Sequence, residues 1–117
     1  MRLTTIPLNL YLATAAAWAE PVTLKGSDIQ ELLSDVVLSA EDNGKTVEQI
    51  FQKSGVTLYS VAGSQSQGFW RVEADKYCSQ WQPNPSWSCY AVVRDGQAVT
   101  FVSSIGKHYE MNLPATP

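Results

Sequence analysis

The sequence predicts a mainly β domain of the α+β class, in which one short N-terminal helix packs on an antiparallel meander of six or seven strands. Stretches of alternating apolar and polar residues, rich in β-branched and aromatic side chains, recur along the chain. Tight-turn dipeptides, Asn43-Gly44 and Asp95-Gly96, separate some of these stretches. Two cysteines can form one disulfide. Such a meander closes most simply into a curled sheet or a small barrel, because closure hides the strand edges.

Residues 1–19 have the layout of a secretory signal peptide. Arg2 supplies a positive start, residues 3–17 are uncharged and mostly apolar, and Ala17-Trp18-Ala19 places small residues where a signal peptidase reads them. We therefore expect cleavage after Ala19 and export to the periplasm. A retained amphipathic helix is the alternative. The apolar run is short for a membrane span and no cysteine follows the cleavage site, so we expect no stable membrane anchor.

Size and charge restrict the partners of the exported chain. Residues 20–113 are enough for a single β-rich domain, and we expect residues 114–117 to be a disordered tail. The whole chain has a formal net charge of −3, and loss of Arg2 with the signal peptide makes the product more acidic. The remaining cations are scattered singly along the sequence. We expect no nucleic-acid partner, because nucleic acids require clustered cations.

Cys78 and Cys89 are the only cysteines of the chain. An exported chain meets an oxidising environment, so we predict that they form a structural disulfide. A metal site would need more ligands, and His108 is the only histidine. A redox pair would normally show Cys-x-x-Cys spacing. We expect neither a metal nor a cofactor.

The first predicted element is a helix over residues 27–33. Ser27 and Gln30 have the spacing of a capping box, which favours a helix start. One face of this helix is apolar and carries Ile29, Leu32 and Leu33. Its length of about two turns means that it depends on packing across a sheet.

Strands follow after the helix. Alternation predicts them at residues 36–39, 56–61, 69–73, 87–94, 98–103 and 108–113. Residues 45–53 fit either a helix or a strand, and the hairpin context favours a strand. Residues 41–44 form the preceding turn; they lack the further carboxylates of a calcium loop. Residues 63–68 are predicted to be a polar loop.

The segment 77–90 concentrates both cysteines and four aromatic residues, which are Tyr77, Trp81, Trp87 and Tyr90. Pro83 and Pro85 stiffen it, and a stiff aromatic loop loses little entropy on binding. One interpretation is a rigid aromatic patch that binds an envelope protein, a glycan or an apolar ligand. The other is that Trp81 and Trp87 cover the disulfide and belong to the core, because a domain this small needs large residues inside. If only one is exposed, we expect it to be Trp81.

The same region carries a resemblance. Gly68-Phe69-Trp70, Tyr77-Cys78-x-x-Trp81, Trp87-x-Cys89-Tyr90 and Asp95-Gly96 resemble small exported alphaproteobacterial proteins of unknown function. The resemblance covers residues 24–33 and 68–96, and residues 36–53 match only loosely. It implies a signal peptide, a short helix and a β-meander with a cysteine pair. It implies no reaction and no catalytic residue.

We expect the protein not to be an enzyme. His108 is the only side chain whose ordinary pKa lies near neutrality, and it falls on a predicted terminal strand. The sequence has no Gly-x-Ser-x-Gly elbow, phosphate loop or dinucleotide fingerprint. The carboxylates that might act as a pair fall at predicted turns or strand ends: Glu41, Asp42, Glu73 and Asp75.

Three functions remain as hypotheses. The first is a periplasmic interaction module that binds an envelope protein or glycan through the loop between Trp81 and Trp87. The second is a small-barrel carrier that holds an apolar ligand inside. The third, which rests on fold-level analogy, is an inhibitor of a cell-wall hydrolase. An exposed tryptophan over a filled interior favours the first, whereas a tryptophan lining a cavity favours the second.

Overall fold

The computed structural model describes residues 20–115, so the predicted signal peptide and its cleavage site lie outside the described residues, as do the last two residues. Within that range the chain forms one helix and nine strands. In chain order the elements are β1 (Val22–Thr23), α2 (Gly26–Leu33), β2 (Val36–Asp42), β3 (Lys45–Phe51), β4 (Val56–Val61), β5 (Ser64–Glu73), β6 (Lys76–Trp81), β7 (Ser88–Asp95), β8 (Ala98–Val102) and β9 (His108–Asn112). The predicted mainly β class with a short N-terminal helix is confirmed.

Strands β2 to β9 form a closed antiparallel barrel in which each strand pairs with the next along the chain. The last strand returns to the first, where Ser39 of β2 pairs with Asn112 of β9. This seam has a single register pair, whereas β2 and β3 pair over seven residues each. The additional strand β1 lies beside β7, with Val22 opposite Arg94. The barrel is therefore complete but weakly closed at one seam.

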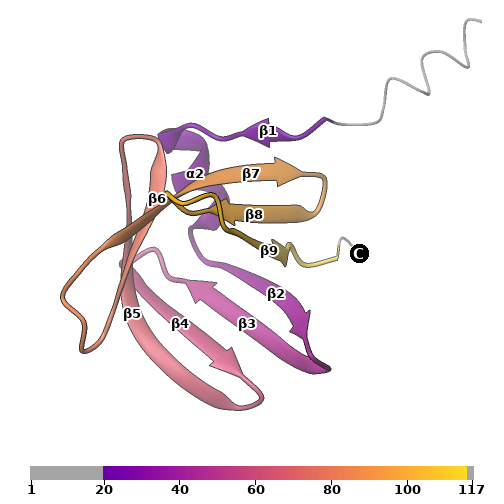
Figure 1. Cartoon of the computed structure of the whole chain (residues 1–117), viewed down its shortest axis with the longest axis vertical. Helices are drawn as coiled ribbons and strands as arrows, with labels where there is room; N and C mark the ends of the chain where they lie inside the picture. Colours follow the sequence, from indigo (N-terminus) through magenta and orange to yellow (C-terminus); the bar gives the residue numbers. More distant parts are fainter. Residues whose placement is uncertain (1–19, 116–117) are drawn as a thin grey trace, which may run out of the picture.

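Helix α2 covers one end of the barrel. It contacts β5, β6 and β2, and Figure 1 shows it near the turn that joins β5 to β6, away from the β2–β3 and β4–β5 turns. Ile29 and Leu33 on its inner face are fully buried. At this end the core centres on Phe51, whose ring meets Trp70 edge-on at 5.9 Å and stacks on Phe101 at 6.2 Å. This end of the barrel is filled with side chains.

The predicted start of the helix was wrong. The helix begins at Gly26, and its first amides are bound by Asp28 and Asp75 instead of by Ser27. The Lys25 amide donates to Asp28 Oδ2 at 3.4 Å, and the Gly26 amide donates to Asp75 Oδ1 at 2.7 Å. Asp75 comes from the distant β5–β6 turn, so local spacing in the sequence did not reveal it.

The number of strands was underestimated. Strand β6 falls in the cysteine-rich segment 77–90, where the sequence predicted no strand before residue 87, and β1 is only two residues long. Strand β5 begins at Ser64, so most of the predicted polar loop at residues 63–68 is strand. Its first residues are exposed because they lie near the rim of the barrel. By contrast, the ambiguous residues 45–53 do form a strand, β3.

Two hairpin turns that contain glycine form at the positions that the sequence predicted. Asn43 and Gly44 have φ values of 52° and 77°, as the predicted turn between β2 and β3 requires. Gly96 has a φ of 63° in the predicted turn between β7 and β8.

After β9, the Pro114 carbonyl accepts a hydrogen bond from Gln97 Nε2 at 2.9 Å. No helix within residues 20–115 is both long enough and apolar enough to cross a membrane.

Candidate functional site

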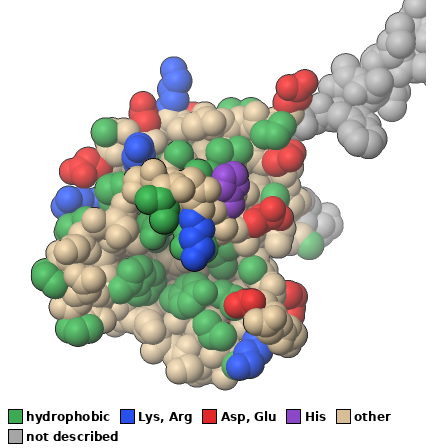
Figure 2. All heavy atoms as spheres, viewed as in Figure 1, with side chains coloured by type: hydrophobic (Ala, Val, Ile, Leu, Met, Phe, Trp, Pro, Cys, Tyr) green, Lys and Arg blue, Asp and Glu red, His purple; other side chains and the backbone are tan. Residues whose placement is uncertain are grey.

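The end of the barrel opposite α2 is hollow. It holds a cavity of about 550 Å³ that opens to solvent. The lining comes from β2 to β9, and its inner part consists of Ala40, Val47, Gln49, Tyr77, Ser79, Phe101 and Met111. Figure 2 shows one face of the molecule hollowed near its centre, with hydrophobic side chains gathered around the hollow. Large side chains fill only the half of the barrel next to α2.

Strand alternation places the lining residues. Successive side chains of a strand point to opposite faces of a sheet, so every second residue of a barrel strand points inward. On β6 these inward residues are Tyr77, Ser79 and Trp81, and all three line the cavity. On β3 they are Val47, Gln49 and Phe51; the first two line the cavity and Phe51 belongs to the core. Polar and apolar residues therefore both point inward.

Six aromatic rings contribute to the cavity wall. The lining includes Tyr59, Tyr77, Trp81, Tyr90, Phe101 and Tyr109. The rings of Tyr59 and Trp81 meet edge-on with centroids 6.0 Å apart, and those of Tyr90 and Tyr109 do so at 6.1 Å. Edge-to-face contacts at such distances hold rings in fixed orientations. The wall therefore presents rigid apolar surface to whatever enters.

The position of Trp81 depends on Gly68, which lies directly opposite it on β5. A side-chain carbon at position 68 would stand 2.7 Å from the Trp81 ring and 2.5 Å from the Gln80 carbonyl oxygen. The absence of a side chain lets the indole lie over the strand. Trp81 Nε1 donates to Ser79 Oγ at 3.1 Å, which fixes the ring further.

A polar network lies deep in the cavity. Gln49 Nε2 donates to Thr57 Oγ1 at 3.0 Å and to the Tyr77 hydroxyl at 3.1 Å. The Thr57 hydroxyl in turn donates to the Ile50 carbonyl at 2.8 Å. Among the hydrogen bonds within residues 20–115, none engages Gln49 Oε1. Because Gln49 is only 7% exposed, this oxygen is a buried acceptor in the cavity lining.

The network is uncharged. Burial raises the pKa of Tyr77 to about 12, although hydrogen bonding to Ser79 and Gln49 opposes the rise. At neutral pH the phenol keeps its proton, and since it accepts from Gln49 it remains able to donate. The inner end of the cavity thus offers an amide acceptor and hydroxyl donors without a formal charge.

Three exposed acidic residues, Glu41, Asp42 and Glu110, border the mouth of the cavity. Strand alternation places the side chains of Glu41 and Glu110 on the outer face, where Glu41 Oε2 accepts a hydrogen bond from Thr46 Oγ1 at 3.0 Å. The register that pairs Ser39 with Asn112 would place Glu41 opposite Glu110, but there the two strands no longer pair. Like charges facing each other across a strand pair are destabilising. The two glutamates thus flank the point where the seam opens.

The predicted aromatic site is divided between two faces of the barrel wall. The cavity brings together Tyr77, Trp81 and Tyr90. Trp87 is on the outer face, where the Arg71 guanidinium carbon lies 4.0 Å from the centre of its ring. Trp81 and Trp87 therefore do not form one continuous surface. His108, at the start of β9, is exposed.

Sequence reasoning missed several residues of the cavity: Gln49, Tyr59, Ser79, Phe101 and Tyr109. These residues are widely spaced along the chain, and only closure of the barrel brings them together. The available signal was alternation. On β9, alternation puts Tyr109 and Met111 on one strand face, and both line the cavity.

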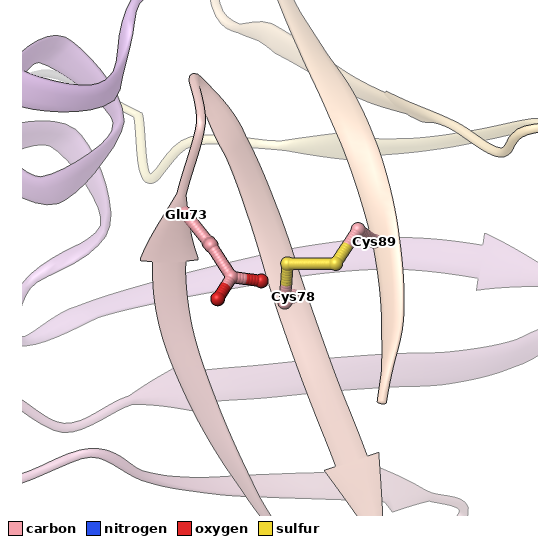
Figure 3. A group of neighbouring side chains, drawn as sticks. All are labelled: Glu73, Cys78 and Cys89. Carbon is pink, nitrogen blue, oxygen red and sulfur yellow. A yellow bond between two sulfur atoms is a disulfide. The ribbon is translucent and has the colours of Figure 1, made fainter. Parts of the chain in front are cut away.

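The predicted disulfide is confirmed. Cys78 of β6 and Cys89 of β7 lie directly opposite each other and are bonded. Figure 3 shows the Glu73 carboxylate beside the bridge, and its oxygen and both sulfurs lie within 4.8 Å of one another. Metal binding needs free thiolates, which the bridge removes. Because these residues point outward, the disulfide fastens the barrel wall without entering the cavity.

The cavity can bind a molecule through aromatic surface and buried hydrogen-bonding groups. Comparison with known proteins finds no matching protein-family model, curated protein or solved structure. The function is therefore inferred from the cavity.

Proposed function

We propose that this protein reversibly binds a small molecule with a largely apolar, ring-containing body inside the open half of its barrel. The observation that carries the proposal is the cavity of about 550 Å³, walled by aromatic rings around a buried, uncharged polar network. Ligand sites are typically concave, mostly apolar and equipped with a few placed polar groups, in a range of about 300–1,000 Å³. Eight-stranded barrels are just wide enough to hold one small ligand.

The site is organised before any ligand arrives. Trp81 is held by Gly68 and Ser79, and Gln49 is held by Thr57 and Tyr77. Ordering of side chains on binding is one of the main costs of association, so groups already fixed by the fold favour affinity. An apolar ring that displaces water from this wall supplies the driving force.

The disulfide supports a site of action outside the cytoplasm. Disulfides persist in oxidising compartments such as the bacterial periplasm. We therefore place the binding function in the periplasm, in keeping with the predicted signal peptide.

An interaction module acting through the loop from Trp81 to Trp87 has less support. The Trp81 ring contributes to the cavity wall, and the Trp87 ring is covered on one side by Arg71. Neither ring is among the large hydrophobic side chains that the described residues expose. The hypothesis of a cell-wall hydrolase inhibitor rests on fold-level analogy alone, and no feature of residues 20–115 supports it separately.

Calorimetric titration with a neutral aromatic alcohol, 2-naphthylmethanol, tests the proposal. Ala40→Phe places a ring in the cavity and should weaken binding at least about tenfold, as loss of one buried ring contact would. Val37→Phe is the matched control, because Val37 is on the same strand but on the outer face, where it is 37% exposed. We expect this variant to bind as the unaltered protein does. Equal binding by the two variants, or no binding to the folded unaltered protein, would refute the cavity as the site.

A further inference from the structure

The orientation of the Gln49 side-chain amide is set by Thr57. The Thr57 hydroxyl donates its single proton to the Ile50 carbonyl oxygen at 2.8 Å, so toward Gln49 its oxygen can only accept. Gln49 therefore turns its Nε2 group toward Thr57, at 3.0 Å, and its Oε1 atom away. The second Nε2 proton is donated to the Tyr77 hydroxyl at 3.1 Å. Within residues 20–115, no donor is left for Gln49 Oε1.

Burial makes this unpaired oxygen important for binding. Gln49 is 7% exposed and lines the cavity, which opens to solvent. Solvent that enters the cavity can donate to Oε1, but a ligand that fills the inner end displaces it. Displacing water from a buried acceptor without replacing its hydrogen bond reduces affinity. A ligand that binds well must therefore bring a donor to this point.

Hydroxyl donors lie in the same inner part of the cavity. The Tyr77 oxygen accepts from Gln49 Nε2, so the phenol can donate its own proton. The Ser79 oxygen likewise accepts from Trp81 Nε1, at 3.1 Å. Both side chains are buried, at 5% and 3% exposure, and both line the cavity. The inner end therefore combines one unpaired acceptor with hydroxyl donors.

Only a neutral group that both donates and accepts satisfies this set. A carboxylate has no proton for Gln49 Oε1, and a ketone or ether oxygen likewise leaves that atom unpaired. An ammonium group can donate, but Gln49, Tyr77 and Ser79 offer it no counter-charge. Burying an unpaired charge is far more costly than burying a neutral polar group. A hydroxyl or an amide group meets both requirements.

We infer that the ligand of this cavity is an uncharged ring compound that carries a hydroxyl or amide group and enters the barrel with that group first. The group donates to Gln49 Oε1 and accepts from the Tyr77 hydroxyl. The apolar body then lies between the rings of the wall, which include Trp81 and Tyr90. The inference rests on the proposed function and adds the chemical class of the ligand and its orientation.

Three naphthalene probes test the inference by calorimetry: 1-(2-naphthyl)ethanol, 2-acetylnaphthalene and 2-naphthoate. The first two share one carbon skeleton, but the ketone has no proton to donate. A buried acceptor without a donor loses free energy equivalent to roughly tenfold in affinity. We therefore expect the alcohol to bind about five- to tenfold more tightly than the ketone. The carboxylate should bind more weakly than both.

A pair of identical substitutions shows whether Gln49 carries the preference. Gln49→Met removes Oε1 and keeps the length of the side chain, so the alcohol and the ketone should bind within about twofold of each other. Gln67→Met is the matched control, because Gln67 is exposed and strand alternation places it on the outer face of β5. This variant should keep the full preference. Thermal melting confirms that each variant is folded.

The outcomes distinguish this inference from the proposed function. Equal affinities of the unaltered protein for the alcohol and the ketone would overturn the inference, whether or not Gln49→Met folds, and leave the cavity function standing. A preference for the alcohol that survives in Gln49→Met would also overturn it, as would 2-naphthoate binding as tightly as the alcohol. Failure of all three probes to bind would overturn both proposals together.

Discussion

Gln49 donates a hydrogen bond of 3.1 Å to the Tyr77 hydroxyl and so joins β3 to β6, two strands that are not neighbours in the sheet. Both side chains are buried, at 7% and 5% exposure. A buried polar group is costly unless it is hydrogen-bonded, and here the Gln49 Nε2 donor is matched by the Tyr77 hydroxyl oxygen as acceptor. The bond spans the barrel interior at the level where the filled half gives way to the hollow half.

The burial of Tyr77 predicts a loss of stability at high pH. Its pKa rises from 10.0 to about 12 on folding. Above pH 10 the unfolded chain releases the phenolic proton while the folded chain retains it, so the free energy of unfolding falls as pH rises. The loss from this group is about 1.4 kcal/mol per pH unit until the folded pKa is reached, and below pH 10 the group contributes no pH dependence.

Urea denaturation of the unaltered protein and of Tyr77→Phe at about pH 8 and about pH 11 measures this effect. The variant lacks the titrating group, so its stability should fall by about 1 kcal/mol less between the two conditions. Tyr109→Phe, which removes a tyrosine hydroxyl at a position that is 45% exposed, is the matched control. A parallel alkaline loss in Tyr77→Phe and the unaltered protein would contradict the predicted titration.

The framework of strands and turns was predictable because its signals are local. The Asn43-Gly44 turn follows from positive φ values that these residues tolerate, and most strands show alternation. The cysteine bridge follows from having one possible pairing. The hydrogen bond from the Gly26 backbone amide to the Asp75 carboxylate was not predictable, because the two residues are 49 positions apart in the sequence.

Most of the cavity lining was not predicted from the sequence, because several of the residues that point into the cavity are polar. Alternation identifies an interior when inward residues are apolar, but around this cavity Gln49, Ser66 and Ser79 also point inward. The sequence therefore predicted no strand at β6 and a polar loop at the start of β5. Trp81 and Trp87 are similar in sequence context, and only the register of β6 and β7 assigns them to opposite faces.

A tight turn offers a stabilising substitution. Ala62 and Gly63 connect β4 to β5 with φ values of 50° and 88°, the same signs as Asn43 and Gly44 in the β2–β3 turn. A left-handed backbone is unfavourable for alanine, whereas Asn-Gly is a preferred pair for such a turn. Ala62→Asn should therefore stabilise the protein by about 0.5–1 kcal/mol in urea denaturation. Asn43→Ala should cost a similar amount, and a stabilising Asn43→Ala would refute the reasoning.

The disulfide should stabilise the barrel without contributing to ligand binding. It closes a loop with a sequence separation of 11 residues, which in the chain-entropy model is worth about 3 kcal/mol. Reduction, or Cys78→Ala with Cys89→Ala, should lower the free energy of unfolding by about that amount. Because the bridge is on the outer face, 2-naphthylmethanol should bind the folded reduced protein with little change. An unchanged urea midpoint after complete reduction would contradict the structural role.

Gly68 links the stability of the wall to the shape of the cavity. A methyl group there would meet the Trp81 ring at 2.7 Å and the Gln80 carbonyl oxygen at 2.5 Å, both too close for packing. Gly68→Ala must displace the indole or the strand, and overpacking of this kind costs about 1–3 kcal/mol. The displaced ring should change the tryptophan emission and weaken 2-naphthylmethanol binding. Gly106→Ala is the control: its φ of 81° gives a backbone cost, but no heavy atom lies within 4 Å of the added carbon. It should therefore lose some stability while keeping both emission and affinity, and a similar loss of affinity in both variants would show that Gly68 does not position Trp81.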